Sequence, residues 1–413
     1  MKKSFKQKIF NDPIYGFISI PGQICYDIIE HPYFQRLRRI KQLGATHLVY
    51  PGALHTRFHH ALGAMHLMAD AIQVLRIKGH EITEEERISA CIAILLHDIG
   101  HGPYSHSLEY ILAEGMNHEG ISAHFMKALN SEFNGELDMA IDIFKGRYHK
   151  KFLHQLVSSQ LDVDRLDYLK RDSFYTGVSE GVISTDRIIS MLEICDDSLA
   201  VEVKGIYSIE KFLIARRLMY WQVYLHKTVI ASEKLLINIL RRAKFLADRG
   251  HELFASPAFH FFLYSSVTKE AFEKDGEILK QFALLDDSDI FLSIKVWMDD
   301  SDRLLSDLSR SFVNRDLYKI RLQSSPFDKA EVEKLRSEVM ERKGLTGDEI
   351  DYYVFTGTIA NNAYDPRFDR INILLRNGEV IDVAEAADQL NVSALAEPVE
   401  KHFFCYPKMN PAR

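Results

Sequence analysis

The chain has 413 residues, of which 46% are hydrophobic and 26% charged, a composition typical of an ordinary folded protein. Its net charge of −7 excludes a global basic field, so any contact with nucleic acid would need a local patch. No stretch of about 18 apolar residues is free of charge, which argues against a membrane span. The sequence predicts a cytoplasmic protein with reduced thiols, because its four cysteines lie far apart, at Cys25, Cys91, Cys195 and Cys405.

Residues 20–315 are expected to be mainly helical, because apolar residues recur there at spacings of three and four. A short extended segment is predicted at residues 14–20 and a hairpin at residues 199–206. One helix can be placed more closely than the others. Thr83 and Glu86 have the spacing of a capping box and precede an apolar helical pattern that continues to Ile99.

The pattern changes after residue 315. Strands are predicted at residues 317–322, 352–359, 370–375 and 402–406, and helices at residues 329–342 and 383–389. Asn377-Gly378 is typical of a hairpin turn. The predicted fold class is therefore mainly α, with a helical domain at residues 1–315, whose first 20 residues form an extended segment, and a small α+β domain at residues 316–413.

The most informative motif is His97-Asp98, which ends the apolar helix and precedes His101 by one turn. An imidazole beside a carboxylate predicts metal ligation, and His97 and His101 share a face if the turn stays helical. Two residues cannot hold a catalytic metal, so further ligands must come from elsewhere. The candidates are His60, at the start of another apolar helix, and the aspartates between residues 162 and 172.

Four polar residues of this aspartate-rich segment share one face if it is helical: Asp164, Tyr168, Arg171 and Asp172. Asp162 and Asp167 point elsewhere and are interpreted as salt-bridge or capping residues. Four other residues also have simpler structural interpretations: His59 and His66 are expected to be structural, and Tyr220 and Trp221 are expected to belong to the core.

These motifs resemble the HD-domain phosphohydrolases, and among them the deoxynucleoside triphosphate triphosphohydrolases that include the mammalian sterile-alpha-motif/HD enzyme. We expect no sterile-alpha-motif module, because the first matching segment begins at residue 11. The matching segments occur in the right order: residues 11–16, 34–44, 51–53, 57–60, 97–106 and 162–172. The resemblance implies an HD-domain helical core and metal ligands at His60, His97, Asp98 and Asp164. This mixed nitrogen and oxygen set suits one divalent ion of Mn, Fe, Zn or Ni, with Mg as a further candidate on the substrate phosphates.

The resemblance also implies roles for residues around the metal. His118 is expected to protonate the leaving oxygen, and His101 and His106 are expected to contact phosphate. Arg165 stands where the mammalian enzyme has lysine, and the two side chains are not geometrically interchangeable. A tyrosine under the sugar would exclude a 2′-hydroxyl. The implied substrate contacts are Gln42, Leu43, Arg57, Arg165, Tyr168, Asp172, Arg216, Tyr224 and Lys227, of which Arg216, Tyr224 and Lys227 belong to one predicted aromatic helix.

Family members with an activator site build it from the N-terminal segment, and Lys8, Asn11, Gln35 and Arg38 match its positions. Glu30 replaces the aspartate that reads the guanine edge, so activation by a guanine nucleotide is a hypothesis. The family's C-terminal region supports contacts between subunits, which predicts a homodimer or homotetramer.

The predicted function is metal-dependent hydrolysis of dNTPs, dGTP among them, to deoxynucleoside and triphosphate by an activated water. One alternative is an HD hydrolase of another nucleotide phosphoester, such as a nucleoside monophosphate or an alarmone. The other is a nucleotide sensor without turnover. Residues 162–172 and 216–227 favour the first function because both match the triphosphohydrolase subgroup. Retention of every proposed ligand argues against a sensor.

Overall fold

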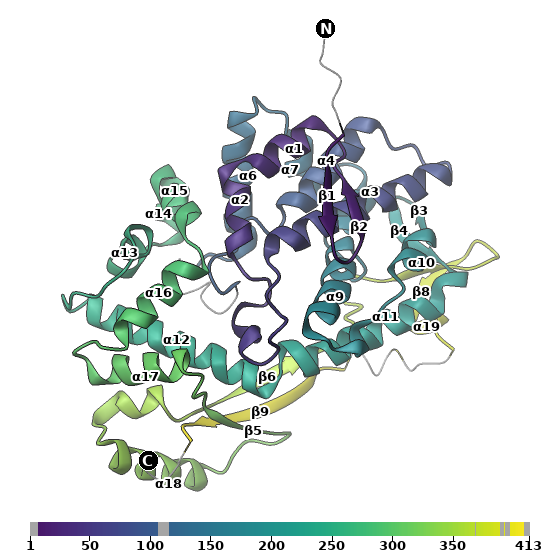
Figure 1. Cartoon of the computed structure of the whole chain (residues 1–413). Coiled ribbons are helices and arrows are strands. Elements are labelled where there is room, and N and C mark those ends of the chain that lie inside the picture. Colours follow the sequence, from purple (N-terminus) through teal and green to yellow (C-terminus); the bar gives the residue numbers. More distant parts are fainter. Residues whose placement is uncertain (1–6, 106–114, 368, 389–391, 393–396, 409–413) are drawn as a thin grey trace.

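The computed structural model describes residues 7–105, 115–367, 369–388, 392 and 397–408. The described part is mainly helical, as predicted, with small sheets at the upper middle, the right and the bottom of the molecule in Figure 1. Within these residues, no helix is long and apolar enough to cross a membrane. The first half contains the helices α1 (Gln23–Glu30), α2 (Pro32–Gln35), α3 (Arg57–Ile77), α4 (Glu84–Leu96), α6 (His118–Glu132), α7 (Asp138–Phe144), α8 (Lys151–Val157) and α9 (Val163–Thr176).

The N-terminal segment is a hairpin rather than the single extended stretch predicted at residues 14–20. Strand β1 (Ile9–Asp12) pairs antiparallel with β2 (Gly16–Ser19). The Asp12 carboxylate accepts hydrogen bonds from the backbone amides of Ile14 and Tyr15, and Gly16 has a φ of +76°. The chain therefore turns inside the segment that was predicted to be extended.

Helix α3 is central to the N-terminal half and packs against both α4 and α9. The α3–α9 contact is close at Gly63, where an added Cβ would lie 2.0 Å from an Asp167 carboxylate oxygen and 2.2 Å from the Arg171 guanidinium. Helix α4 begins where the sequence predicts, because Thr83 and Glu86 form a reciprocal capping box. Helix α3 thus holds its neighbour in the sequence, α4, and the distant α9 on its two sides.

The segment after α9 departs from two predictions. The hairpin predicted at residues 199–206 lies earlier, with β3 (Leu192–Cys195) paired to β4 (Ser198–Glu202), because the chain reverses at Asp196 and Asp197 with φ of +48° and +61°. The helix predicted at residues 216–227 is interrupted. After α10 (Thr185–Ser190), helix α11 (Ile206–Met219) passes into a π-helical turn at Tyr220–Tyr224, and α12 (Lys227–Ala247) begins afresh.

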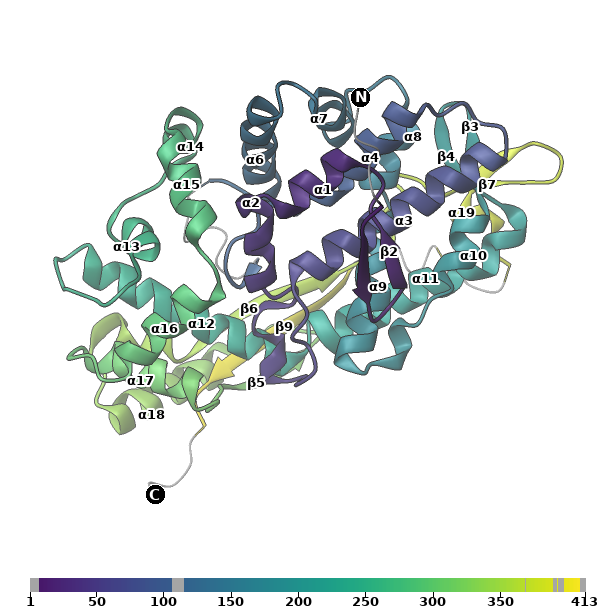
Figure 2. The same ribbon diagram turned by 45° about the horizontal axis from the view of Figure 1, so that its top comes forward.

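Helices α13 and α17 pack against α12, and a three-stranded sheet of order β5-β9-β6 lies alongside it (Figures 1 and 2). All strands of that sheet are antiparallel neighbours. The elements are α13 (Pro257–Tyr264), α14 (Lys269–Lys274), α15 (Gly276–Leu284), α16 (Asp287–Trp297), α17 (Arg303–Val313), β5 (Lys319–Gln323), α18 (Lys329–Lys343), β6 (Phe355–Asn361) and β9 (Val399–Tyr406).

The C-terminal residues do not form one separate sheet. Strand β7 (Asn372–Leu374) pairs with β8 (Val380–Asp382) through the predicted Asn377-Gly378 turn, and it also pairs parallel with β4. Helix α19 (Val383–Ala386) follows directly. The domain boundary at residue 316 stays a prediction. Strands β7 and β8, which follow this boundary, share a sheet with β3 and β4, which precede it.

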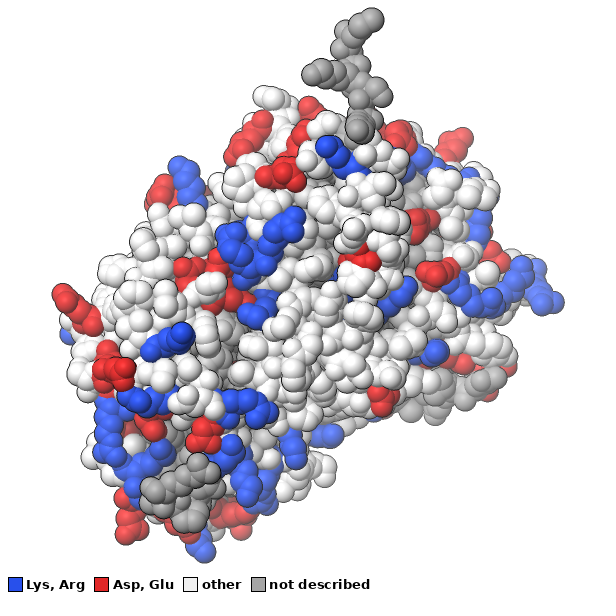
Figure 3. All heavy atoms as spheres, in the orientation of Figure 1, with Lys and Arg blue, Asp and Glu red and all other residues white. Residues whose placement is uncertain are grey.

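Charge on the outer surface is mixed. On the face in Figure 3, Lys and Arg side chains gather near the upper middle and again toward the lower left, in both places beside Asp and Glu side chains. Arg39 and Lys41 are both paired, with Asp286 and Asp287 respectively. This face therefore offers no broad basic surface for nucleic acid.

Candidate active site and metal centre

Three helix ends supply the predicted metal ligands. His60 lies in the first turn of α3, His97 and Asp98 follow the last turn of α4, and Asp164 lies in the first turn of α9. The packing of α3 against α4 and α9 brings these ends together. His59, beside His60, is structural as predicted: its Nδ1 accepts a hydrogen bond from the Thr56 amide at 3.2 Å at the start of α3.

The two histidines present the same ring nitrogen to the cluster. His60 Nδ1 lies 2.7 Å from an Asp167 carboxylate oxygen, and His97 Nδ1 lies 2.6 Å from the Ile94 carbonyl oxygen. Because a carboxylate and a carbonyl can only accept, both Nδ1 atoms carry the hydrogen. Each Nε2 therefore keeps its lone pair for an ion, an orientation that is usual for metal-binding histidines.

The donor atoms converge to distances that suit one ion. Asp164 Oδ1 lies 3.0 Å from His60 Nε2 and 3.4 Å from His97 Nε2, and the two Nε2 atoms are 3.4 Å apart. The Asp98 carboxylate lies 3.4 Å from His97 Nε2 and 3.8 Å from His60 Nε2. Donors that bind a metal at about 2.0–2.2 Å stand about 3–4 Å from one another, so the four residues fit a divalent transition metal.

Electrostatics in this cluster also favour a cation. Burial alone would lower the pKa of His60, but hydrogen bonds with Asp164 and Asp167 outweigh it and raise that pKa to about 10. Burial acts in the opposite direction on Asp164, whose pKa is nevertheless lowered by His60 and His97. In the absence of a metal, the carboxylates favour protonation of the imidazoles. A bound metal ion would supply the positive charge instead of the proton.

Asp167 stands behind the ligands in a buried network. Besides His60, it accepts two hydrogen bonds from the Arg171 guanidinium, both 2.9 Å long. Arg171 also donates to Asp12 at 2.8 Å. The interpretation of Asp167 as a salt-bridge residue is confirmed. Arg171 keeps the predicted helical spacing from Asp164, but its guanidinium pairs with Asp167 and Asp12.

A second group of residues lies on the other side of Asp98. His101 Nε2 is 3.3 Å from an Asp98 carboxylate oxygen, and the rings of His101 and His118 stack with centroids 4.0 Å apart and planes 14° apart. The donor atoms of Asp98, His101 and His118 also lie close enough together to form a second group that could hold a metal ion, so the roles of the two histidines in proton transfer and phosphate contact stay predictions. His101 does not join His97, because α4 ends at Leu96.

The stacked pair is placed by the contact between α6 and the loop after α4. At Gly100, an added Cβ would lie 2.2 Å from the His118 carbonyl oxygen, so a larger residue would push α6 away. Burial and the nearby Arg57 hold the pKa of His101 well below its usual value, which leaves it neutral. His106, the third predicted histidine, lies outside the described residues.

Arg57 links this second group to the metal ligands. It donates to the Asp98 carboxylate, and its Nε and one terminal nitrogen lie 3.0 Å and 2.8 Å from the Ser105 hydroxyl. Its side chain still lines a cavity, and a guanidinium has five donor hydrogens, so it can reach a ligand as well.

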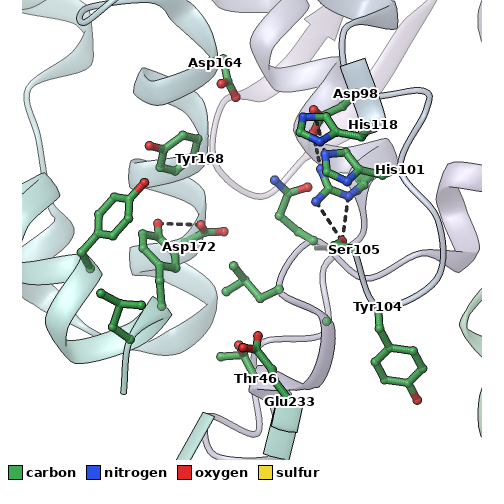
Figure 4. A pocket seen from close by; sticks show the side chains of 17 residues that line it. Thr46, Asp98, His101, Tyr104, Ser105, His118, Asp164, Tyr168, Asp172 and Glu233 are labelled. Atoms are coloured by element: carbon green, nitrogen blue, oxygen red, sulfur yellow. Dashed lines mark hydrogen bonds and ion pairs between the residues drawn. The ribbon is translucent and has the colours of Figure 1, made fainter. Parts of the chain in front are cut away.

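The cavity beside the metal ligands has a volume of about 410 Å³ (Figure 4). Six of the nine predicted substrate contacts line it: Gln42, Leu43, Arg57, Tyr168, Asp172 and Tyr224. The Gln42 side-chain oxygen is buried and has no hydrogen-bond partner among the described residues. A buried acceptor oxygen without a partner favours binding of a ligand that has a hydrogen-bond donor at this position.

Three predicted phosphate contacts do not line this cavity. Arg165 pairs with Asp162, the residue that caps α9. Arg216 is buried and donates to the Gln160 side chain at 3.2 Å and to the Ala363 carbonyl at 3.0 Å. Lys227 is exposed at the start of α12, beyond the π-helical turn. Their contact with phosphate stays a prediction.

Of the predicted activator residues, Gln35 and Arg38 contact each other, whereas Lys8 contacts a different residue. Arg38 donates to the Gln35 side chain at 2.8 Å and stacks over Phe58 at 3.6 Å from its ring centroid. Phe58 also contacts Phe10, the neighbour of Asn11, at 6.2 Å between centroids. Lys8 turns instead to Tyr26, 5.0 Å from that ring.

Several lining residues were not predicted from the sequence. Tyr220 was assigned to the core, but the π-helical turn brings it to the cavity beside Tyr224, with their ring centroids 5.0 Å apart. His55 does not line the cavity itself, but its Nε2 lies 2.7 Å from the carboxylate of Asp172, which does. The other lining residues that were not predicted are Gly44, Thr46, Tyr104, Ser105, Leu225 and Glu233.

Comparisons with known proteins agree with this geometry. The family profile of the HD domain matches residues 57–172, and that of the HD associated region matches residues 183–248. Uncharacterized protein YwfO of Bacillus subtilis is 32% identical over 98% of this chain and 93% of its own length. A crystal structure of a phosphohydrolase from Bacteroides thetaiotaomicron has 52% identity and a TM-score of 0.94, covering 98% of this chain and all of that one.

The chain therefore belongs to the HD-domain phosphohydrolase family, as the sequence motifs predict. A deoxynucleoside triphosphate triphosphohydrolase SAMHD1 homolog of Dictyostelium discoideum is 32% identical over 57% of this chain and 49% of that protein. HD domains bind divalent metals, and the His60, His97 and Asp164 donors form a group that could hold one. The family and the donor group together support a metal-dependent hydrolase.

Proposed function

We propose that the protein hydrolyses deoxynucleoside triphosphates, dGTP among them, to deoxynucleoside and inorganic triphosphate. One observation carries this proposal: a single cavity joins the metal ligands to a wall of tyrosines and Asp172. A phosphate held at one end would therefore place a sugar against the other residues of the same cavity. The similarity to the Dictyostelium triphosphohydrolase supports the same substrate class.

The residues around the ligands supply the remaining chemistry. A bound Mn, Fe, Zn or Ni ion would polarise a phosphoryl oxygen and provide a nucleophilic water at neutral pH. Arg57 neutralises phosphate charge, and neutral His101 donates a hydrogen bond to a phosphate oxygen. His118 then gives a proton to the leaving 5′-oxygen, a step that typically contributes about 10²- to 10⁴-fold.

The tyrosines account for a preference for deoxyribose. Tyr224 donates a hydrogen bond of 2.8 Å to Asp172, whose other carboxylate oxygen contacts His55. Tyr168 meets Tyr224 edge to face at 6.1 Å between centroids. These contacts hold the Tyr224 ring in a fixed place, where it fills the space that a 2′-hydroxyl would need.

Regulation and assembly form the second part of the proposal. A guanine nucleotide would contact Gln35 and Arg38, which already lie together, with Lys8 and Asn11 from the N-terminal segment. The proposed assembly is a homodimer or homotetramer with contacts from residues 316–413. Mg accompanies the substrate phosphates, and the enzyme acts in the cytoplasm.

The substrate class is tested by turnover of all four dNTPs and all four NTPs, with Mn and Mg supplied, with and without GTP. The wild type is expected to prefer dNTPs and to respond to GTP. Replacing Tyr224 by alanine opens space beside the sugar, so the ratio of dGTP to GTP turnover should fall about 10-fold or more. Tyr224→Phe keeps the ring and should retain most of that ratio.

Other substrates would contradict the proposal in recognisable ways. Turnover of nucleoside monophosphates or alarmones but not of dNTPs would identify a different HD hydrolase. Nucleotide binding without turnover under any metal would identify a sensor. Equal ratios for Tyr224→Ala and the wild type would remove the tyrosine from the account of deoxyribose selection.

A further inference from the structure

The cavity has two chemically different ends. In Figure 4, Asp98, His118 and Asp164 lie at one end, Thr46 and Glu233 lie at the other, and Asp172 lies on a side wall between them. The first end contains the metal ligands and the histidines. The second end contains the Glu233 carboxylate on α12, and the described residues that line this end include no Lys or Arg.

A carboxylate at that end cannot serve the phosphates, because it would repel them. It is instead suited to the part of a nucleotide that carries hydrogen-bond donors. Leu43 and Leu225 also line the cavity and offer apolar surface for a flat ring. A nucleotide whose phosphates face the ligands and whose sugar faces Asp172 therefore directs its base toward Glu233.

We infer that Glu233 forms a base-binding subsite that discriminates among the four bases by the hydrogen-bond donors on their edges. Guanine is preferred and thymine is disfavoured. This inference rests on the proposed function, since it requires a nucleotide in the cavity. An ionised carboxylate only accepts hydrogen bonds and has two oxygens with about four acceptor sites. It can therefore read a base edge in addition to the interaction that Glu233 makes within the protein.

The order of bases follows from their edges. Guanine presents N1–H and the N2 amino group side by side, which match the two carboxylate oxygens. Adenine and cytosine present one amino group next to a bare acceptor, so they offer one favourable bond beside one repulsion. Thymine presents a single N–H between two carbonyl oxygens, which the carboxylate repels on both sides.

The local fold keeps the carboxylate in place. Glu233 is half-buried in the second turn of α12, and α12 packs against the turn at Gly44–Leu48 that carries Thr46. Thr46 is only 3% exposed, so the floor of this end is closed. A side chain on a packed helix discriminates more strictly than one on a loop, because it cannot move aside for the wrong base.

The test compares kcat/KM for the four dNTPs in the metal-loaded wild type and in Glu233→Gln. A good bidentate pair with a base discriminates by about 10- to 100-fold, so the wild type should prefer dGTP over TTP by that factor. Glutamine keeps the size of the side chain but replaces one acceptor oxygen by a donor amide. The dGTP to TTP ratio should therefore fall at least about 10-fold in the variant, chiefly through KM. Glu252→Gln, at an exposed site after α12, is the matched control and should leave the ratio unchanged.

The outcomes separate this inference from the proposed function. If no dNTP is turned over by the wild type, the proposed function fails. If dNTPs are turned over but Glu233→Gln changes all four equally, Glu233 has a structural role and the inference is overturned while the function stands. A wild type that turns over dGTP and TTP equally would overturn it in the same way.

Discussion

Replacing Asp164 by alanine is expected to abolish metal binding and to lower kcat/KM by about 10³-fold or more. Asp164 is the donor nearest to His60 Nε2, at 3.0 Å, and it also faces His97. A bound ion contributes several kcal/mol to the transition state, and about 4 kcal/mol corresponds to a factor of about 10³. Elemental analysis of the purified variant together with its turnover measures both effects.

Asp186→Ala provides the control, because Asp186 is an exposed acid in the first turn of another helix, α10. It should keep its metal and its activity. If Asp164→Ala retained a full equivalent of metal and wild-type turnover, the ligand set would be wrong. If only the biological activity survived, the protein would act as a scaffold and not as an enzyme.

Asp167→Asn should lower both stability and metal affinity. The substitution leaves the shape but removes the charge that pairs with buried Arg171, and breaking a buried pair costs about 3–5 kcal/mol. It also allows the amide to donate to His60 Nδ1, which disturbs the tautomer that presents Nε2 to the ion. Loss of such an outer contact typically reduces metal affinity about 10- to 100-fold.

The pH dependence of unfolding gives this prediction a second readout. Burial alone would raise the pKa of Asp167, but Arg171 and His60 outweigh it and hold that pKa at about 2. Since the unfolded value is about 4, the stabilisation from this carboxylate is complete above pH of about 4 and is lost as the pH falls toward 2. Denaturant titrations should show this loss in the wild type and not in Asp167→Asn.

Asp248→Asn is the matched control for that experiment. Asp248 pairs with Lys244 at 3.8 Å on the exposed end of α12, where an ion pair contributes at most about 1 kcal/mol. An equal change in the two variants would mean that the Asp167 network is not what holds α3 to α9.

The sequence predicts best where a local pattern determines the structure. The capping box at Thr83 places α4, and the end of α4 delivers His97 and Asp98. Asn377-Gly378 makes the turn between β7 and β8 for the same reason: its preference is local. Lys329–Lys343 is helical close to the predicted range because its pattern needs no distant partner.

Prediction from the sequence fails where contacts between distant parts of the chain determine the position of a side chain. Arg171 has the right helical spacing to share the face of Asp164, yet the α3–α9 contact at Gly63 draws it to Asp167 and Asp12. Tyr220 has an apolar helical context, but a π-helical turn rotates it into the cavity. Neither a close helix contact nor a π turn has a signature in a single sequence.

The most direct test of the proposed reaction is hydrolysis of dGTP in water labelled with ¹⁸O, with the products separated and weighed by mass spectrometry. Attack at the α-phosphorus predicts unlabelled deoxyguanosine and inorganic triphosphate that carries one ¹⁸O atom. Labelled orthophosphate or pyrophosphate, with dGDP or dGMP as the other product, would contradict the account, because the water would have attacked a different phosphorus.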